Sequence, residues 1–181
     1  MLVYGDSLSA AYGMPERNGW VALLGERLKR ERPNYSVANA SISSETTAGG
    51  LVRFGKVLEQ HRPAIVILEL GANDGLRGLP MAAMKKNLSA MIMKSQKAGA
   101  KVLLVGVRLP PNYGDAYTRA FAQTYAELAK QYRTALVPFL FEGFGEKMDF
   151  FQADNMHPTI AAQPLLLNNV WDPLVPLFRK K

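Results

Sequence analysis

Residues 2–9 read LVYGDSLS: a short apolar run, a glycine and then a group of polar side chains. The apolar run predicts a buried β-strand over Leu2–Gly5, and Gly5 allows a tight turn at its end. Similar apolar runs, often β-branched and followed by a breaker, return along the chain. They predict strands at Ser36–Ala40, Ala64–Leu70, Lys101–Val107 and Ala135–Phe139. Near-continuous apolar strands are typical of a parallel sheet that is covered on both faces.

Amphipathic stretches with a helical period separate the predicted strands. They lie at Gly19–Arg30, Thr47–His61, Met81–Lys97, Asp115–Gln131 and Ala161–Leu177. Pro164, Pro173 and Pro176 predict that the last stretch breaks into two or more shorter segments. The alternation implies an α/β fold with right-handed crossovers, and we expect a single domain over residues 1–181. Ligands of such sheets bind beyond the carboxyl ends of the strands, where functional residues are therefore expected.

The composition excludes several classes of protein. With 48% hydrophobic and 20% charged residues, the 181-residue chain is neither disordered nor fibrous. Apolar runs such as Ala64–Leu68 are too short to span a bilayer. The absence of cysteine removes disulfides, thiolate zinc sites and a cysteine nucleophile. No histidine pair or acidic cluster has metal-ligand spacing, and no glycine-rich nucleotide-binding motif is present.

The net charge of +7 comes from one segment. Residues 75–114 carry seven basic side chains and no acidic one, whereas the rest of the chain holds 15 of each sign. The seven are Arg77, Lys85, Lys86, Lys94, Lys97, Lys101 and Arg108. Two interpretations of these residues are open. One is a solvated lysine face that favours solubility, and the other is a surface that attracts anionic substrates or contacts an anionic membrane.

Ser7 follows the first predicted strand. A serine in this place is commonly a helix N-cap or a turn residue, and it acts as a nucleophile only where a base accepts its proton. The chain has two histidines. His61 ends an amphipathic stretch, where a solvated imidazole suits the helix dipole. His157 follows the last predicted strand and is the candidate base.

Two further polar residues follow predicted strands. Asp154 lies three residues before His157, and a carboxylate there can bond one ring nitrogen and stabilise the imidazolium while the other nitrogen faces a serine. Alternatively, Asp154 caps a helix that begins near Pro158. Asn73 follows the third strand, and its amide could hold the negative oxygen of a tetrahedral intermediate. The alternative for Asn73 is an Asn-Asp turn.

These residues, in this order, resemble the SGNH (GDSL) hydrolase family, most closely its bacterial branch of multifunctional thioesterases, proteases, lysophospholipases and arylesterases. The resemblance covers essentially the whole chain. It rests on Gly5–Ser9, Asn39–Ser43, Leu68–Gly78, Arg108–Gly114, Asp154–Pro158 and Ala162–Pro164. It implies a three-layer α/β/α sandwich, flavodoxin-like, with a five-stranded parallel sheet. It also implies that no metal or organic cofactor is needed.

The resemblance assigns roles to the candidate residues. Ser7 is the nucleophile, His157 the general base and then acid, and Asp154 its orienting partner. The oxyanion hole combines the Ser7 backbone N–H, a second backbone N–H and the Asn73 side chain. The implied reaction is acyl transfer from carboxylic esters and acyl thioesters (aryl esters, acyl-CoA, lysophospholipids) through an acyl-enzyme on Ser7.

The second backbone N–H of the predicted hole departs from the family pattern. The family usually places a glycine there, but this chain has Ser44, followed by Glu45 where an aspartate is usual. Serine retains the N–H, yet a positive φ would strain it by about 1–3 kcal/mol. We therefore expect Ser44 to keep the role with somewhat reduced activity.

The substrate side is expected in the two segments that border the basic region. The candidate substrate-binding residues are Leu76, Arg77, Leu79, Arg108, Pro110 and Tyr113, although the apolar ones among them can instead order their loops. We expect a monomer. We also expect no nucleic-acid partner, because no aromatic residues are interleaved with the lysines along the helix. We expect no integral membrane association and at most weak contact with an anionic lipid surface. The resemblance implies a periplasmic protein whose leader is absent from this chain, and a cytoplasmic location stays open.

Two alternative functions remain at this point. The same triad serves carbohydrate O-acetyl esterases and acyltransferases of the family. From a different class, a non-catalytic flavodoxin-like module could use its basic surface to bind a membrane or nucleic acid.

Overall fold

The computed structural model describes residues 1–178, so the last three positions of the predicted domain 1–181 lie outside the described residues. Five strands form one parallel sheet in the order β2-β1-β3-β4-β5. They are β1 (Leu2–Gly5), β2 (Ala38–Asn39), β3 (Ile65–Glu69), β4 (Lys101–Val105) and β5 (Ala135–Val137). This order is flavodoxin-like, which confirms the predicted fold class.

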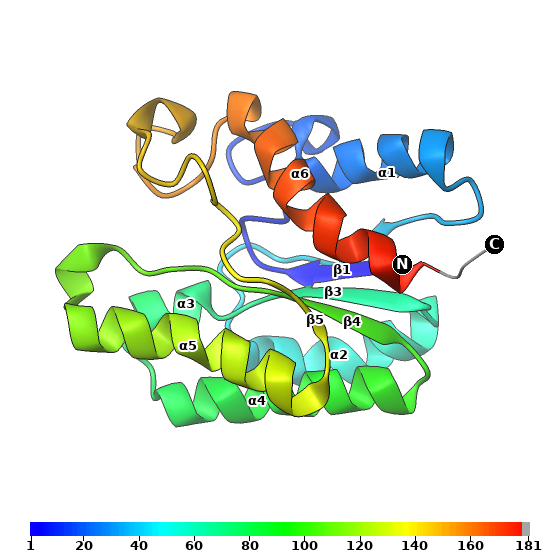
Figure 1. Ribbon diagram of the computed structural model, residues 1–181, viewed down its shortest axis with the longest axis horizontal. Coiled ribbons are helices and arrows are strands. Elements are labelled where there is room, and N and C mark those ends of the chain that lie inside the picture. The colour runs from blue at the N-terminus through cyan, green and yellow to red at the C-terminus, as the bar shows by residue number, and fades with distance from the viewer. Residues whose placement is uncertain (179–181) are drawn as a thin grey trace.

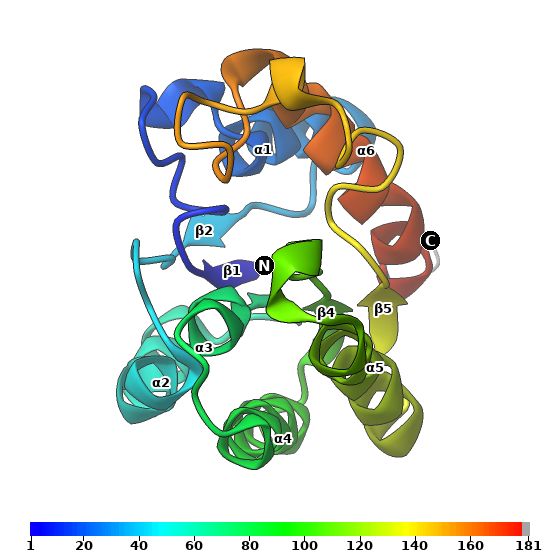
Figure 2. The ribbon, with the colours of Figure 1, turned by 90° about the vertical axis from the view of Figure 1, so that its left-hand side faces the viewer.

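Helices cover both faces of the sheet (Figure 1). The upper layer holds α1 (Trp20–Glu31) and α6 (Gln163–Leu174). The lower layer holds α2 (Thr47–His61), the short α3 (Ala72–Leu76), α4 (Met81–Lys97) and α5 (Asp115–Tyr132). Figure 2, turned by 90°, shows the two layers of helices on either side of the strands. The predicted three-layer sandwich is thus confirmed.

The two central strands are buried along their whole length. Every residue of Leu2–Gly5 and of Ile65–Glu69 is buried, because each strand has a paired neighbour on both sides and helices above and below. Burial on both faces explains why these strands are near-continuous apolar runs. Glu69 is the exception, a buried acid at the end of β3.

The predicted elements differ from the observed ones mainly at their ends. The helices Thr47–His61 and Met81–Lys97 have the predicted bounds, whereas the strand predicted at Ser36–Ala40 contracts to Ala38–Asn39. That strand lies at the sheet edge, where Ala38 and Asn39 pair with Leu2 and Val3 of β1. Beyond the strand, the N–H groups of Ala40 and Ile42 still donate to the carbonyls of Val3 and Gly5. As the prolines predicted, the last segment is broken: α6 is flanked by the 3₁₀ turns Ile160–Ala162 and Val175–Leu177, although Pro173 lies inside it.

Helix α3 was not predicted. Its sequence, with two glycines around an Asn-Asp pair, favours a turn. In the structure the N–H of Gly75 donates to the Gly71 carbonyl at 3.0 Å, and the turn continues as a short helix beside α4. Within residues 1–178, none of the helices is both long and apolar enough to cross a membrane.

Candidate active site

The candidate residues gather at the carboxyl edge of the sheet. Ser7, Ser44 and Asn73 follow β1, β2 and β3, which are neighbours in the sheet. Asp154 and His157 come from the long segment that leads from β5 to α6. Because parallel strands end at one edge, residues far apart in the chain meet beyond β1 and β3. The connections that follow β1 and β3 leave the sheet in opposite directions at this point, and ligands of such sheets usually bind there.

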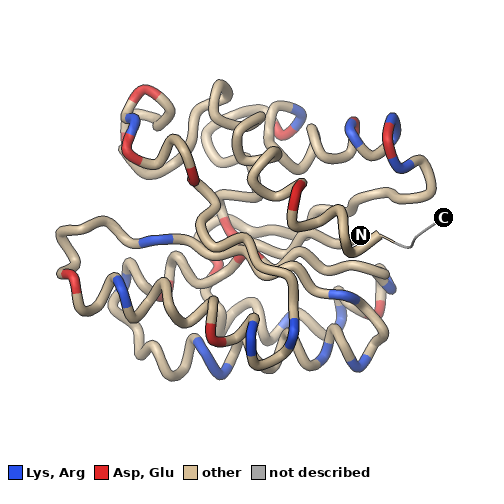
Figure 3. The backbone as a smooth tube through the Cα atoms, viewed as in Figure 1, with Lys and Arg blue, Asp and Glu red and all other residues tan. Residues whose placement is uncertain are grey.

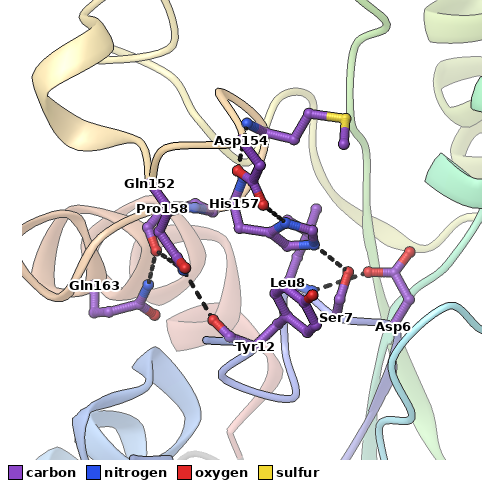
Figure 4. Close-up of polar contacts among 10 residues, drawn as sticks. Asp6, Ser7, Leu8, Tyr12, Gln152, Asp154, His157, Pro158 and Gln163 are labelled. Carbon is purple, nitrogen blue, oxygen red and sulfur yellow. Dashed lines mark hydrogen bonds and ion pairs between the residues drawn. The ribbon is translucent and has the colours of Figure 1, made fainter. Parts of the chain in front are cut away.

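Ser7, His157 and Asp154 form a continuous hydrogen-bonded chain (Figure 4). His157 Nε2 lies 2.9 Å from Ser7 Oγ, and His157 Nδ1 lies 2.6 Å from Asp154 Oδ2. The other carboxylate oxygen, Oδ1, accepts the backbone N–H groups of Met156 at 2.9 Å and His157 at 3.0 Å. Oδ1 therefore stabilises the loop around Asp154, whereas Oδ2 orients the imidazole. The arrangement allows a proton to pass from Ser7 to His157.

The charge state of Asp154 suits this arrangement. Burial raises the pKa of Asp154, but the N–H groups of His157 and Met156 and the imidazole outweigh it and lower the pKa to about 2. The carboxylate is therefore ionised at neutral pH. It can hold the proton on His157 Nδ1 and leave Nε2 free to accept one from Ser7.

Tyr12 and Gln152 support the imidazole, and sequence reasoning missed both. The Tyr12 ring lies against the His157 ring, with centroids 4.3 Å apart and planes tilted by 36°. Gln152 Nε2 donates to the Tyr12 carbonyl at 2.9 Å and the Pro158 carbonyl at 3.1 Å. The backbone N–H of Gln152 also donates to the His157 carbonyl at 2.8 Å. No local pattern could reveal these contacts, because 140 residues separate Tyr12 from Gln152.

Three sets of N–H groups stand near the nucleophile. The backbone N–H groups of Ser7 and Ser44 donate to no residue in the part of the chain that the structure describes. Asn73 Nδ2 donates to Asp6 Oδ2 at 3.1 Å and to the Glu45 carbonyl at 3.0 Å. Ser44 has a φ of +65°, the left-handed value that the missing glycine would adopt without strain. Donors of this kind stabilise the oxygen of a tetrahedral intermediate.

Two buried carboxyl groups lie beneath these donors. Asp6 accepts the N–H of Leu8 at 3.0 Å as well as the Asn73 amide. Glu69 Oε2 accepts the hydroxyl of Ser9 at 2.8 Å and the N–H of Asp6 at 3.3 Å, whereas its buried Oε1 has no partner within residues 1–178.

Burial raises the pKa values of both carboxyl groups. Burial raises the pKa of Asp6 to about 7, although the hydrogen bonds from Leu8 and Asn73 oppose the shift. Burial also raises the pKa of Glu69 well above its usual range, and the charge of Asp6 adds to the effect. Each of the two carboxyl groups accepts two hydrogen bonds, so the raised pKa of Glu69 follows from its burial and from the charge of Asp6, and not from a lack of donors. An acid inside the apolar run Ala64–Leu70 was the signal in the sequence for this feature.

The predicted substrate-binding residues are two arginines and four apolar or aromatic residues, and the latter lie on two neighbouring segments. The Tyr113 hydroxyl donates to the Leu76 carbonyl at 3.0 Å, which joins the end of α3 to the segment after β4. Leu79 and Tyr113 are each 38% exposed, so both offer apolar surface to solvent. Pro110 precedes the 3₁₀ turn Pro111–Tyr113 and sets its start.

The two predicted arginines have partners within the protein. Arg77 Nη2 donates to the Ser44 carbonyl at 3.2 Å. The Arg108 guanidinium lies 4.4 Å from the centre of the Phe139 ring and 3.8 Å from Glu142 Oε2. Arg77 is thus joined to the candidate oxyanion hole, whereas Arg108 is directed toward the segment that follows β5. Among the described residues, no group of three or more His, Asp or Glu side chains is placed to hold a metal ion.

Comparison with known proteins identifies the family. The model of the GDSL-like lipase/acylhydrolase family matches residues 3–163. The chain is 53% identical over 178 residues to the esterase TesA of Pseudomonas aeruginosa, a match that covers 98% of this chain and 89% of the relative. It is 40% identical over 177 residues to the thioesterase 1/protease 1/lysophospholipase L1 of Escherichia coli, with 98% and 84% covered. A crystal structure of TesA has a TM-score of 0.95 at 53% identity, over 98% of both chains. The chain therefore belongs to the GDSL-like lipase/acylhydrolase family, the SGNH hydrolases that its motifs resemble.

Proposed function

We propose that this protein is a serine esterase and thioesterase that hydrolyses aryl esters, acyl-CoA and lysophospholipids through an acyl-enzyme on Ser7. The observation that carries the proposal is the hydrogen-bonded chain from Ser7 Oγ through His157 to Asp154, with distances of 2.9 and 2.6 Å. It lies beside two backbone N–H groups that have no partner in residues 1–178. The esterase and thioesterase names of the two relatives support the same reaction class.

The geometry supports a two-step acyl transfer. Ser7 Oγ attacks the carbonyl carbon while its proton passes to His157 Nε2, and the Asp154 carboxylate stabilises the imidazolium. His157 then gives the proton to the leaving alcohol or thiol, and the acyl group stays on Ser7. A water molecule repeats the sequence: it loses a proton to His157, attacks the acyl-enzyme, and releases the acid as Ser7 regains its proton.

The oxyanion that forms in each step is assigned to three donors. The backbone N–H groups of Ser7 and Ser44 are available to it without breaking a bond to residues 1–178. The Asn73 amide must share one N–H that it now donates to Asp6 or to the Glu45 carbonyl. Loss of one such donor typically lowers kcat by about 10²–10³-fold.

The proposal also covers the residues that contact the substrate, the oligomeric state, the location and the contact with lipid. Leu76, Leu79 and Tyr113 would contact the acyl or aryl group, since they border the same edge of the sheet as Ser7. We further propose a monomer in the periplasm that makes at most weak contact with an anionic lipid surface. The resemblance to exported enzymes supports the location, and the basic helix α4 supports the lipid contact.

Replacement of the nucleophile tests the proposed reaction. We expect Ser7→Ala to lower kcat/KM for p-nitrophenyl butyrate by at least about 10³-fold, because no acyl-enzyme can form without the hydroxyl. The donors that still bind the oxyanion account for the residual rate. Ser89→Ala, on α4 and away from the triad, is the matched control and should retain wild-type activity. Circular dichroism checks that each variant is folded. Hydrolysis that survives Ser7→Ala would refute the proposal, and a series from acetyl to palmitoyl esters separates lipid-type from O-acetyl specificity.

A further inference from the structure

The segment that carries the Ser44 N–H is a strained turn. The Glu45 N–H donates to the Ile42 carbonyl at 3.2 Å, which closes a β-turn over Ile42–Glu45. Ser44 is the third residue of this turn and has a φ of +65°, whereas Ser43 does not have a positive φ. This combination is the type II turn, whose third position favours glycine because a side chain is strained there. A serine at this position therefore tends to leave the left-handed region.

Ser44 can relax by a rearrangement of the turn that moves the peptides on both sides of it, so a bond to either peptide opposes the rearrangement. The following peptide is held at both ends: its carbonyl accepts Arg77 Nη2 at 3.2 Å, and its N–H is the one bonded to Ile42. The preceding peptide has no partner at the Ser43 carbonyl or the Ser44 N–H within residues 1–178. That N–H is therefore available to an oxyanion. Arg77 is thus one of two bonds that restrain the strained residue before substrate binds.

We propose that Arg77 is a positioning residue for the oxyanion hole. By holding the Ser44 carbonyl, it keeps the serine-containing turn in the conformation that directs the Ser44 N–H at the reacting carbonyl. The restraint matters because this chain has serine at a position that suits glycine, since a glycine would hold the same φ without help. The inference rests on the proposed function, in which the Ser44 N–H stabilises the oxyanion.

A second role for Arg77, attraction of anionic substrates, is separated from this one by choosing a neutral substrate. p-Nitrophenyl acetate carries no charge and has a short acyl group, so it needs neither an ion pair nor a long apolar contact. An effect of Arg77 on kcat for this ester then reports on the transition state, whereas an effect on KM alone reports on ground-state binding.

The test is a double-mutant cycle between Arg77→Met and Ser44→Gly. In the wild-type background, we expect Arg77→Met to lower kcat for p-nitrophenyl acetate by about fivefold, the size of one lost hydrogen bond, with KM nearly unchanged. In the Ser44→Gly background, the same substitution should lower kcat by less than about twofold, because glycine needs no restraint. Methionine keeps an unbranched apolar side chain in place of the arginine stem, so packing is largely retained.

Arg108→Met is the matched control. Arg108 lies at the same edge of the sheet but contacts Phe139 and Glu142 instead of Ser44, so its effect should be equal in both backgrounds. Equal losses from Arg77→Met in both backgrounds, no loss in either, or a change in KM alone would each overturn the proposal. Failure of the proposed function gives a different result, namely hydrolysis that persists in Ser7→Ala.

Discussion

Glu69 ends β3 with its side chain fully buried, and the segment after β1 places Asp6 beside it. Burial raises the pKa of Glu69 well above the value of about 4.3 that a glutamate has in an unfolded chain. Between these two pKa values, the folded protein binds a proton that the unfolded chain has lost. The free energy of unfolding therefore falls as pH rises above about 4.3, and continues to fall until Glu69 ionises in the folded state.

We expect Glu69→Gln to reduce this loss of stability. Glutamine has no proton to release, so the fall in the free energy of unfolding between pH 5 and pH 8 should be smaller than in the wild type. Urea unfolding at several pH values measures it. Glu146→Gln, which changes an exposed acid, is the control and should keep the wild-type pH dependence. If Glu69→Gln also keeps it, another group holds the proton.

At the scale of elements, the proposed substrate side of the site lies on two segments that follow different strands. The end of α3 and the 3₁₀ turn Pro111–Tyr113 are joined by the Tyr113 hydroxyl, which donates to the Leu76 carbonyl at 3.0 Å. The Tyr117 hydroxyl, on α5, donates to the Gly75 carbonyl at 3.2 Å. These bonds connect the ends of α3 and α5, so the two segments should hold a bound acyl or aryl group as one unit.

We expect Tyr113→Phe to raise KM for p-nitrophenyl butyrate by about two- to fivefold, with kcat nearly unchanged. The substitution removes one hydrogen bond but keeps the aromatic ring, so the substrate-side surface loosens while the triad is untouched. Steady-state kinetics measures the separation of kcat from KM. Tyr132→Phe, at the far end of α5, is the control. A fall in kcat with constant KM would show that the bond positions the catalytic groups instead.

At the scale of the whole molecule, Lys and Arg lie in both layers of helices (Figure 3), and the excess of positive charge belongs to residues 75–114, which include α4 of the lower layer. Four of the seven basic residues of the segment 75–114 have partners in the protein: Arg77, Lys85, Lys101 and Arg108. Lys86, Lys94 and Lys97, all on α4, make no ion pair within residues 1–178. Helix α4 begins directly after residues 77–80 and ends at the opposite edge of the sheet, so Lys86 is nearer to the site than Lys94 and Lys97.

The field of these lysines predicts a dependence on salt that differs between substrates. We expect kcat/KM for an anionic acyl-CoA to fall steeply as ionic strength rises, whereas that for neutral p-nitrophenyl acetate should hardly change. Replacing Lys86, Lys94 and Lys97 together by glutamine should flatten the response to acyl-CoA. Stopped assays over a range of NaCl concentrations measure it. An equal salt dependence for both substrates would show that the lysines serve solubility alone.

The amino-acid sequence by itself determined the alternation of strands and helices, the parallel sheet and the positions of Ser7, Asn73 and His157 beyond strand ends. These features depend on local signals: apolar runs, helical periods and the glycines and prolines that end them. Composition likewise located the whole charge excess in residues 75–114. The departure at Ser44 was also visible in the sequence, and the structure shows the left-handed backbone that makes it costly.

Only the tertiary structure decided how these pieces act on one another. Helix α3 forms from a segment with turn propensity, and Gln152 holds the turn of Tyr12 from 140 residues away. Arg77, expected to face substrate, also bonds the carbonyl of Ser44, and the pKa of Glu69 is raised because β3 is buried on both faces. Such contacts join segments that are distant in the chain, and burial depends on everything packed around a residue. Local sequence signals contain neither kind of information.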